Sequence, residues 1–159
     1  MTVSSAALAG LLERLDELES RNAIQDLVTD YCQGFDKKNV ERFLSIWWDD
    51  CVWDIGGKPF GDFSGLTEIE RAYHDLIWPT WRETHHLTTN LRLWFEEKDR
   101  ARGECDVDVM GASPTNELIV VGATYHDQFE RRNGVWKILL RKVQMHFYNP
   151  VSEHDLRLP

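Results

Sequence analysis

Four side chains of this chain of 159 residues have the types that acid–base chemistry requires: Tyr31, Asp36, His86 and Arg141. A carboxylate that accepts the N–H of an imidazole fixes the tautomer of the ring and supports the imidazolium. The other ring nitrogen can then act as a base near neutral pH. An arginine supplies a fixed positive charge where a leaving group or an oxyanion develops. These are the parts that proton abstraction and β-elimination need.

Each of these side chains also has a purely structural interpretation. Asp36 lies in Phe-Asp-Lys-Lys and could be a turn or capping carboxylate, and His86 could be a hydrogen-bonded core histidine. Arg141 could be a surface arginine whose stem lies along apolar neighbours, and Tyr31 could be a core tyrosine. Residue types and periodicity alone leave both interpretations open.

Motifs that bind nucleotides or metals are absent from the sequence. It contains no GxGxxG, GxxxxGK[ST], HExxH or GxSxG pattern, which disfavours a nucleotide cofactor, a zinc-protease site and an α/β-hydrolase. His85 and His86 are adjacent, so on a strand they point to opposite faces and cannot both bind one metal ion. We therefore expect a protein that uses no metal ion and no other cofactor.

The composition limits the partners and the location. With 18 Lys and Arg against 27 Asp and Glu, the formal net charge is −9, which disfavours nucleic acid and anionic membrane surfaces as partners. Three cysteines without a CxxC pair indicate a reduced protein. The first ten residues lack the basic segment of a signal peptide, and charged residues follow at once. We expect neither a signal peptide nor a membrane span, and a cytoplasmic location.

The first part of the chain has helical periodicity. Apolar residues recur at spacings of three and four between residues 11 and 31, and Gly34 is a plausible end of this helix. Asn39 can cap a short second helix that includes residues 43–47.

A short strand, a turn and a third helix are expected next. The strand covers residues 51–53, and the turn covers 54–59. A capping-box sequence begins at Thr67, which predicts a helix over residues 68–77 that ends before Pro79.

The second half of the chain alternates with a period of two. Strands are predicted over 87–96, 103–110, 118–131 and 135–148, and Arg132-Asn133-Gly134 is a strong hairpin signal between the last two. Helices followed by long antiparallel strands predict an α+β domain. We expect the N-terminal helices to pack on a strongly curved, mostly antiparallel sheet that forms a cone-shaped barrel with an internal pocket.

Five short segments occur in the order and at nearly the separations of a known family: AIQDL at 23–27, FDK at 35–37, SIWWDD at 45–50, THH with TNLRL at 84–93, and ERRNGVWK at 130–137. Together they resemble the SnoaL-like family of the nuclear-transport-factor-like, cystatin-like superfamily of cone-shaped α+β folds. The likeness is strongest to dehydrochlorinases of that family, with dehydratase-like features, and it covers residues 23–150.

The resemblance implies a set of site residues. An Asp–His dyad falls on Asp36 and His86, and an arginine five residues after the tryptophan of the last hairpin is Arg141. Tyr31 stands where dehydratases of the family carry a phenol that handles the leaving oxygen, and Cys32 adjoins it. The resemblance implies that the substrate is bound by Trp53, Val107, Val109, Tyr125, Val143 and Met145. Cys32 is added to these substrate-binding positions because it adjoins Tyr31.

The resemblance also implies a function. It predicts a cofactor-independent lyase in which His86, oriented by Asp36, removes a proton and HCl or water is eliminated from a small hydrophobic cyclic molecule. Arg141 would face the leaving group and Tyr31 would donate to it. Two alternatives stay open: a ketosteroid-type isomerase that uses the same dyad, and a non-catalytic ligand-binding module like the small subunit of ring-hydroxylating dioxygenases.

The expected organisation is a single SnoaL-like domain over residues 1–159. It has an N-terminal helical extension at 1–20, a core at 23–150 and a C-terminal tail at 151–159. The resemblance implies that the protein assembles as a homotrimer through the sheet and the tail.

Overall fold

A computed structural model describes residues 4–56 and 61–151. The expected tail beyond residue 151 and the end of the expected turn at 54–59 lie outside the described residues. No helix within these ranges is long and apolar enough to cross a membrane.

One sheet of six strands, in the order β2-β1-β6-β5-β4-β3, forms the frame of the molecule. Neighbouring strands are antiparallel except β1 and β6, which run parallel. The strands are β1 (Trp47–Asp54), β2 (Asp62–Ser64), β3 (Glu83–Glu97), β4 (Arg100–Ala112), β5 (Leu118–Arg132) and β6 (Val135–Val151).

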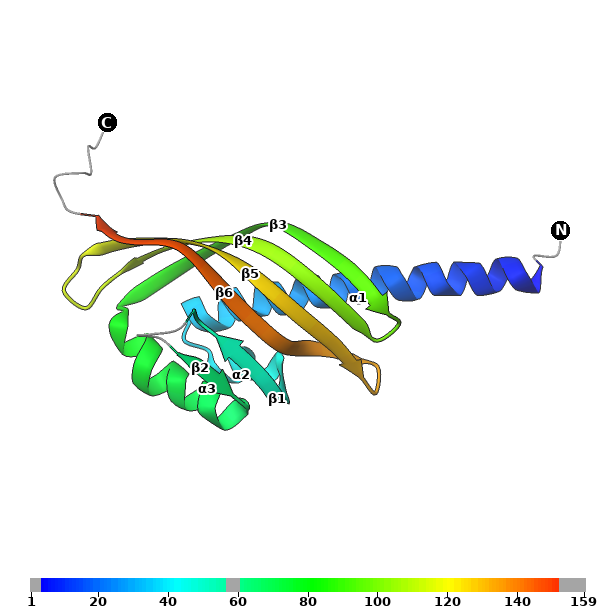
Figure 1. Cartoon of the computed structure of the whole chain (residues 1–159), viewed down its shortest axis with the longest axis horizontal. Coiled ribbons are helices and arrows are strands. Elements are labelled where there is room, and N and C mark those ends of the chain that lie inside the picture. The colour runs from blue at the N-terminus through cyan, green and yellow to red at the C-terminus, as the bar shows by residue number, and fades with distance from the viewer. Residues whose placement is uncertain (1–3, 57–60, 152–159) are drawn as a thin grey trace, which may run out of the picture.

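The helical segments precede the four long strands and lie under the curved sheet. They are α1 (Ser5–Asp36), α2 (Val40–Ser45), α3 (Leu66–Ala72), the π-helical η1 (Tyr73–Ile77) and the 3₁₀ turn η2 (Trp78–Thr80). In Figure 1 the strands β3 to β6 arch over α1, and α2, α3, β1 and β2 lie beneath one end of the arch. The predicted α+β class, with helices packed on a curved and mostly antiparallel sheet, is confirmed.

The sheet is strongly curved as predicted, but it does not close into a complete barrel. The two ends of the sheet are β2 and β3, and these strands do not pair with each other within the described part of the chain. β2 has only three residues, and helices occupy the concave side that closure would need. The sheet is therefore an open arch whose hollow side is covered by helices.

The long strands occur where alternation predicts them. β3 begins at Glu83, before the start that alternation predicts, so His86 is the fourth residue of the strand and not its first. Asn133 and Gly134 have φ of 52° and 81°, as a two-residue hairpin turn requires. Along β4 the burial alternates strictly between buried and exposed positions, which gives the sheet one face toward the helices and one toward solvent.

Gly34 does not end α1, because the helix continues to Asp36. A Cβ atom on Gly34 would lie 2.7 Å from the backbone nitrogen of Phe43, so the glycine allows α2 to pack closely on α1. The prediction that Asn39 caps α2 is confirmed, since its side chain accepts a hydrogen bond from the backbone of Arg42 at 3.0 Å.

The predicted second and third helices both differ from the structure. α2 ends at Ser45, and β1 already begins at Trp47 because that residue pairs with β6. α3 begins directly after Gly65, whose backbone N–H donates to Cys51 at 2.7 Å, and no side chain caps it. The capping-box prediction is therefore wrong, and the segment that contains Pro79 continues as a π-helical and a 3₁₀ turn.

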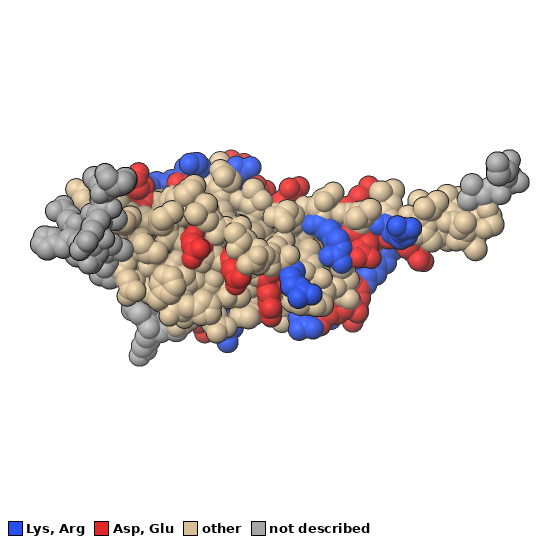
Figure 2. All heavy atoms as spheres, turned by 90° about the horizontal axis from the view of Figure 1, so that it is seen from above, with Lys and Arg blue, Asp and Glu red and all other residues tan. Residues whose placement is uncertain are grey.

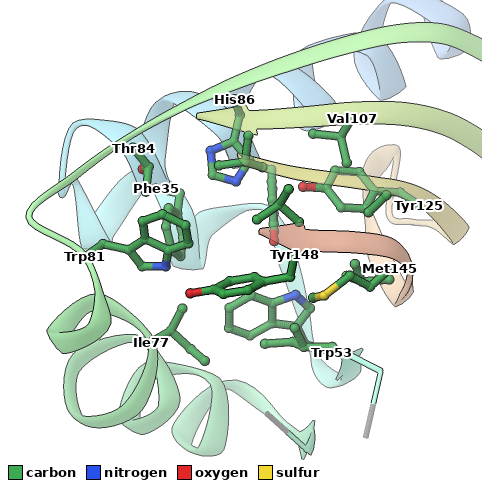
Figure 3. A pocket seen from close by; sticks show the side chains of 16 residues that line it. Phe35, Trp53, Ile77, Trp81, Thr84, His86, Val107, Tyr125, Met145 and Tyr148 are labelled. Atoms are coloured by element: carbon green, nitrogen blue, oxygen red, sulfur yellow. The ribbon is translucent and has the colours of Figure 1, made fainter. Parts of the chain in front are cut away.

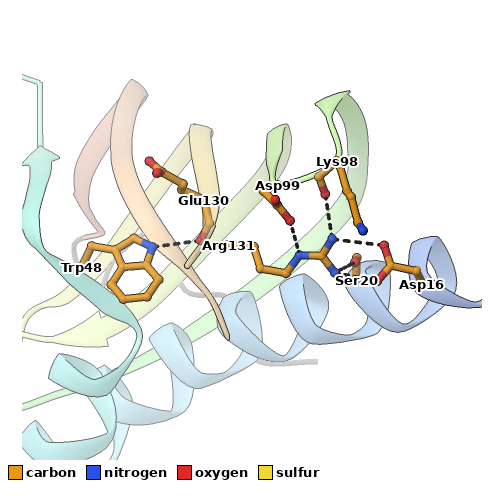
Figure 4. Close-up of polar contacts among 7 residues, drawn as sticks. All are labelled: Asp16, Ser20, Trp48, Lys98, Asp99, Glu130 and Arg131. Carbon is orange, nitrogen blue, oxygen red and sulfur yellow. Dashed lines mark hydrogen bonds and ion pairs between the residues drawn. The ribbon is translucent and has the colours of Figure 1, made fainter. Parts of the chain in front are cut away.

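Arg131, near the end of β5, ties α1 to the sheet (Figure 4). Its guanidinium donates to Asp16 at 2.7 and 3.1 Å and to Ser20 at 3.4 Å. It also donates to the Asp99 carboxylate at 2.6 Å and to the backbone of Lys98 at 3.0 Å. This contact fixes the direction and the rotation of the middle of α1 against the sheet.

Candidate active site

An apolar cavity lies between the end of α1, the segment before β3 and the concave face of the sheet (Figure 3). It contains about 610 Å³ of empty space, including its opening to solvent. In Figure 3, His86 and Tyr125 extend into it from the sheet, and the side chains of Trp81, Ile77 and Tyr148 also converge on it. The side chains that line it are Tyr31, Phe35, Trp53, Ile55, Ile77, Trp81, Thr84, His86, Val107, Val109, Val121, Ala123, Tyr125, Val143, Met145 and Tyr148.

A histidine and a carboxylate meet at the wall of this cavity. The Nδ1 atom of His86 lies 2.6 Å from Oδ1 of Asp36, and the two side chains are only 7% and 5% exposed. Asp36 is the last residue of α1, and His86 lies near the start of β3. Because Nδ1 faces the carboxylate as a donor, Nε2 is the ring nitrogen with a free lone pair.

Two further hydrogen bonds hold the Asp36 carboxylate. The backbone N–H of His86 donates to Oδ2 at 2.9 Å, and the Thr84 hydroxyl donates to Oδ1 at 2.8 Å. Burial raises the pKa of Asp36. The hydrogen bonds from His86, the charge of His86 and the hydrogen bond from Thr84 all lower it, and together they outweigh burial, so the pKa of Asp36 lies below its usual value. The carboxylate is thus ionised at neutral pH and is fixed against the imidazole ring.

Arg141 is completely buried and is paired with Asp127 on the neighbouring strand. Its Nε and Nη2 atoms donate to the two carboxylate oxygens at 2.8 and 2.6 Å, and neither side chain is exposed. Burial alone would lower the pKa of Arg141, but the Asp127 carboxylate raises it above its usual value. The arginine is therefore a permanent cation inside the protein, not a surface residue.

Two tyrosines separate this arginine from the cavity. The guanidinium carbon lies 4.1 Å from the ring centroids of both Tyr31 and Tyr125, and both rings line the cavity whereas Arg141 does not. Burial raises the pKa of Tyr31 to about 12, although the nearby charge of Arg141 opposes this shift. Tyr31 is consequently a neutral phenol at any ordinary pH.

Three buried N–H groups near Tyr31 lack a partner among the described residues: Nη1 of Arg141 and Nε1 of both Trp47 and Trp53. The Trp53 ring lies 6.2 Å from the Tyr31 ring and lines the cavity. Buried donors are normally satisfied, and Trp53 is the residue of this group that lines the cavity, so its N–H is the donor available to an electron-rich atom of a ligand.

The structure distributes the residues expected from the sequence over two layers. Tyr31 and His86 line the cavity together with six expected wall residues: Trp53, Val107, Val109, Tyr125, Val143 and Met145. Asp36 and Arg141 stand behind the wall and contact it. Cys32 does not line the cavity; it is buried beside it, and burial raises the pKa of its thiol to about 11.

Several site residues escape the sequence analysis. Val121 and Ala123 share the inward face of β5 with Tyr125, and Thr84 shares the face of His86, so alternation could have found them. Trp81 and Ile77 come from the irregular segment before β3, where no periodicity points to a pocket.

A protein from Nostoc punctiforme that is described as having a cystatin-like fold matches with a TM-score of 0.66 over 79% of this chain and 90% of that chain; at 20% identity it indicates the fold alone. A putative scytalone dehydratase from Novosphingobium aromaticivorans shares the fold, with a TM-score of 0.77 over 86% of this chain and 91% of that chain. It is only 17% identical and indicates the fold alone.

Residues 16–142 match the SnoaL-like domain, and the chain belongs to this family. Hexachlorocyclohexane dehydrochlorinase 1 of Sphingobium indicum is 40% identical over 139 residues, which are 87% of this chain and 89% of that protein. The crystal structure of a type 2 hexachlorocyclohexane dehydrochlorinase matches with a TM-score of 0.85 and 38% identity, over 92% of this chain and 98% of that chain. As the sequence predicts, the chain is an enzyme of the lyase class.

Proposed function

We propose that this enzyme eliminates HCl from a small chlorinated ring compound, with His86 as the base. The observation that carries the proposal is the 2.6 Å contact between a buried Asp36 carboxylate and an imidazole at the wall of an apolar cavity. The similarity to proteins named hexachlorocyclohexane dehydrochlorinase supports chloride as the leaving group.

The reaction begins at Nε2 of His86, which accepts a proton from a ring carbon of the substrate. The electron pair of the broken C–H bond forms a carbon–carbon double bond, and the adjacent C–Cl bond breaks to release chloride. The ionised Asp36 stabilises the imidazolium that forms and keeps the ring in the required tautomer. General base catalysis of this kind contributes about 10²–10⁴-fold to the rate.

The leaving chloride is accommodated beside Tyr31 and Trp53, whose rings lie 6.2 Å apart at the cavity wall. Arg141 acts mainly through its charge, because it lies behind the tyrosine rings. A hydroxyl leaves poorly without an acid, whereas chloride leaves without a proton. The neutral phenol of Tyr31 favours water loss as a second candidate reaction, since it could protonate a leaving oxygen.

The rest of the cavity binds the apolar body of the substrate. Val107, Val109, Tyr125, Val143 and Met145 present alternate side chains of three adjacent strands to it. Such a wall excludes water. It thereby strengthens the charge interactions at the proton that His86 removes and at the chloride that leaves. All groups that the reaction needs are side chains of this protein, so the proposal includes no cofactor.

Chloride release from γ-hexachlorocyclohexane tests the proposal directly. The wild type should release chloride and yield a product that has lost HCl, and His86→Ala should not, although it stays folded. An isomerase would give a product of unchanged mass, and a non-catalytic module would bind without turnover. A hydroxylated ring compound, followed by its loss of water, distinguishes the two leaving groups.

We also propose that the enzyme is a homotrimer of this single domain, assembled through the outer face of the sheet and the C-terminal segment. Leu87, Met110 and Phe147 are 43%, 40% and 45% exposed, and the helices lie on the other face of the sheet. Light scattering of the wild type and of Met110→Lys tests this: a monomeric mass for the wild type would contradict the proposal.

A further inference from the structure

The N-terminal half of α1 projects beyond the sheet (Figure 1). It carries five leucines that are each between 50% and 59% exposed: Leu8, Leu11, Leu12, Leu15 and Leu18. Figure 2 shows that the tip of this helix has almost no charged side chains, whereas charges gather where the helix meets the sheet. We call these five residues the leucine stripe.

The leucine stripe faces away from the body of the protein. Ile24 and Val28 are completely buried against the sheet, and Ile24 follows Leu15 by nine residues, which is about two and a half helical turns. The two sets of side chains therefore project from opposite sides of α1. The contacts of Arg131 with Asp16 fix this rotation (Figure 4).

The spacing of the leucine stripe is that of a coiled-coil seam. Leu8 and Leu15 occupy a positions of a heptad, and Leu11 and Leu18 occupy its d positions. The next a position is Asn22, which is exposed, and a polar asparagine at one a position specifies register and strand number. The family match begins at residue 16, so four of the five leucines precede it and the SnoaL-like chemistry does not account for them.

The charges beside the seam are complementary to those of a second copy. In a parallel pair of helices, a g residue of one chain faces the e residue five positions later in the other. These positions are Arg14 and Glu19, and among the residues that the structure describes neither forms an ion pair within its own chain. An antiparallel pair would bring like charges together at these positions instead.

We propose that the leucine stripe pairs with the leucine stripe of a second copy of this chain, as a short parallel two-stranded coiled coil. The sheet and the cavity lie on the opposite side of each helix, so the two bodies lie outside the pair and the active sites stay open. This contact is separate from the outer sheet face of the proposed trimer, and it would join either monomers or trimers.

Substitution of the stripe tests the contact without touching the cavity. The doubly substituted Leu11→Lys, Leu15→Lys should reduce the mass in light scattering to half of the wild-type mass or less, because both side chains are exposed in one copy. Leu76→Lys is the matched control, since Leu76 is 43% exposed on η1. Circular dichroism and turnover should match the wild type in both variants. An unchanged mass for the stripe variant would overturn the proposal.

Charge reversal tests whether the partner is a second copy in parallel register. Arg14→Glu and Glu19→Arg should each weaken association in a dilution series, and the double variant should restore it. Pairing with another surface of the protein, or with another protein, predicts no restoration.

A cysteine on the stripe gives an independent readout. Leu11→Cys should form a disulfide-linked dimer under a mild oxidant, because d positions face each other in a parallel pair. Leu76→Cys should not. The native cysteines are buried, and their pKa values are raised to about 11, so that they do not compete. Failure of Leu11→Cys to cross-link would exclude the parallel register.

Discussion

The buried pair of Arg141 and Asp127 makes a sharp prediction for the variant Asp127→Asn. The two hydrogen bonds, at 2.8 and 2.6 Å, both involve charged groups, and both side chains are fully buried. Asparagine keeps one acceptor but turns its NH₂ group toward the guanidinium, and it removes the charge that balances Arg141. Breaking a buried ion pair in this way costs about 3–5 kcal/mol. At about 2–4 °C per kcal/mol for a chain of this size, the melting temperature should fall by roughly 6–20 °C.

Asp50→Asn is the matched control for this measurement. Asp50 forms the same two-bond pair with Arg132, at 2.8 and 2.9 Å, but its side chain is 61% exposed. Surface pairs of this kind contribute about 0–1 kcal/mol, so the melting temperature of Asp50→Asn should stay close to that of the wild type. Calorimetry of the three proteins at neutral pH compares the two environments directly.

A double variant separates stability from catalysis. Replacing both members of a buried pair by apolar residues is often neutral or stabilising, so Asp127→Leu combined with Arg141→Met should recover most of the lost stability. Chloride release should nevertheless remain far below that of the wild type, because the cation behind Tyr31 is gone. Wild-type stability of Asp127→Asn, or full activity of the double variant, would refute the reasoning.

Four further changes test other parts of the molecule. His86→Ala should lower kcat for chloride release by about 10²-fold or more with little change in melting temperature. Tyr31→Phe should spare chloride elimination but impair water elimination; equal losses in both assays would mean that Tyr31 only shapes the cavity. The lowered pKa of Asp36 stabilises the fold above pH ~4, and this contribution is lost as the pH falls through the folded-state pKa. The free energies of unfolding of the wild type and Asp36→Asn should therefore converge in acid. Gly34→Ala places a methyl group against the backbone of Phe43 and should destabilise the protein by about 1–3 kcal/mol in denaturant titrations.

The alternation of the strands is the part of the fold that the sequence predicts best. In β4 every second residue is buried, so the positions of Val107 and Val109 on the concave face follow from a local rule that packing does not overrule. The hairpin turn at Asn133 and Gly134 is equally local, because both residues tolerate positive φ. Local rules fail where contacts between distant elements determine why a residue is needed. Gly34 is an example, because it does not end α1 but allows α2 to pack closely on it.

Asp127 shows why one part of the site could not be predicted. Counting back from the hairpin turn, a regular ladder would place His126 opposite Arg141. The register shifts by one residue between Gln128 and Phe129, so that Asp127 faces the arginine instead. A bulge of this kind has no sequence signal here, yet it decides whether the guanidinium meets an imidazole or a carboxylate.

The Asp36–His86 and Asp127–Arg141 pairs act on the proposed reaction in the same way, each through a charge that is fixed before the reaction begins. Proton abstraction creates a positive charge on His86, whose ring already contacts the ionised Asp36. Departure of the leaving group creates a negative charge near Tyr31, whose ring lies 4.1 Å from the guanidinium of Arg141 and 6.1 Å from the His86 ring. Each charge that develops in the proposed reaction thus meets an opposite charge that folding has already fixed and desolvated. Because these partners need not reorganise during the reaction, they stabilise the transition state more than the neutral substrate.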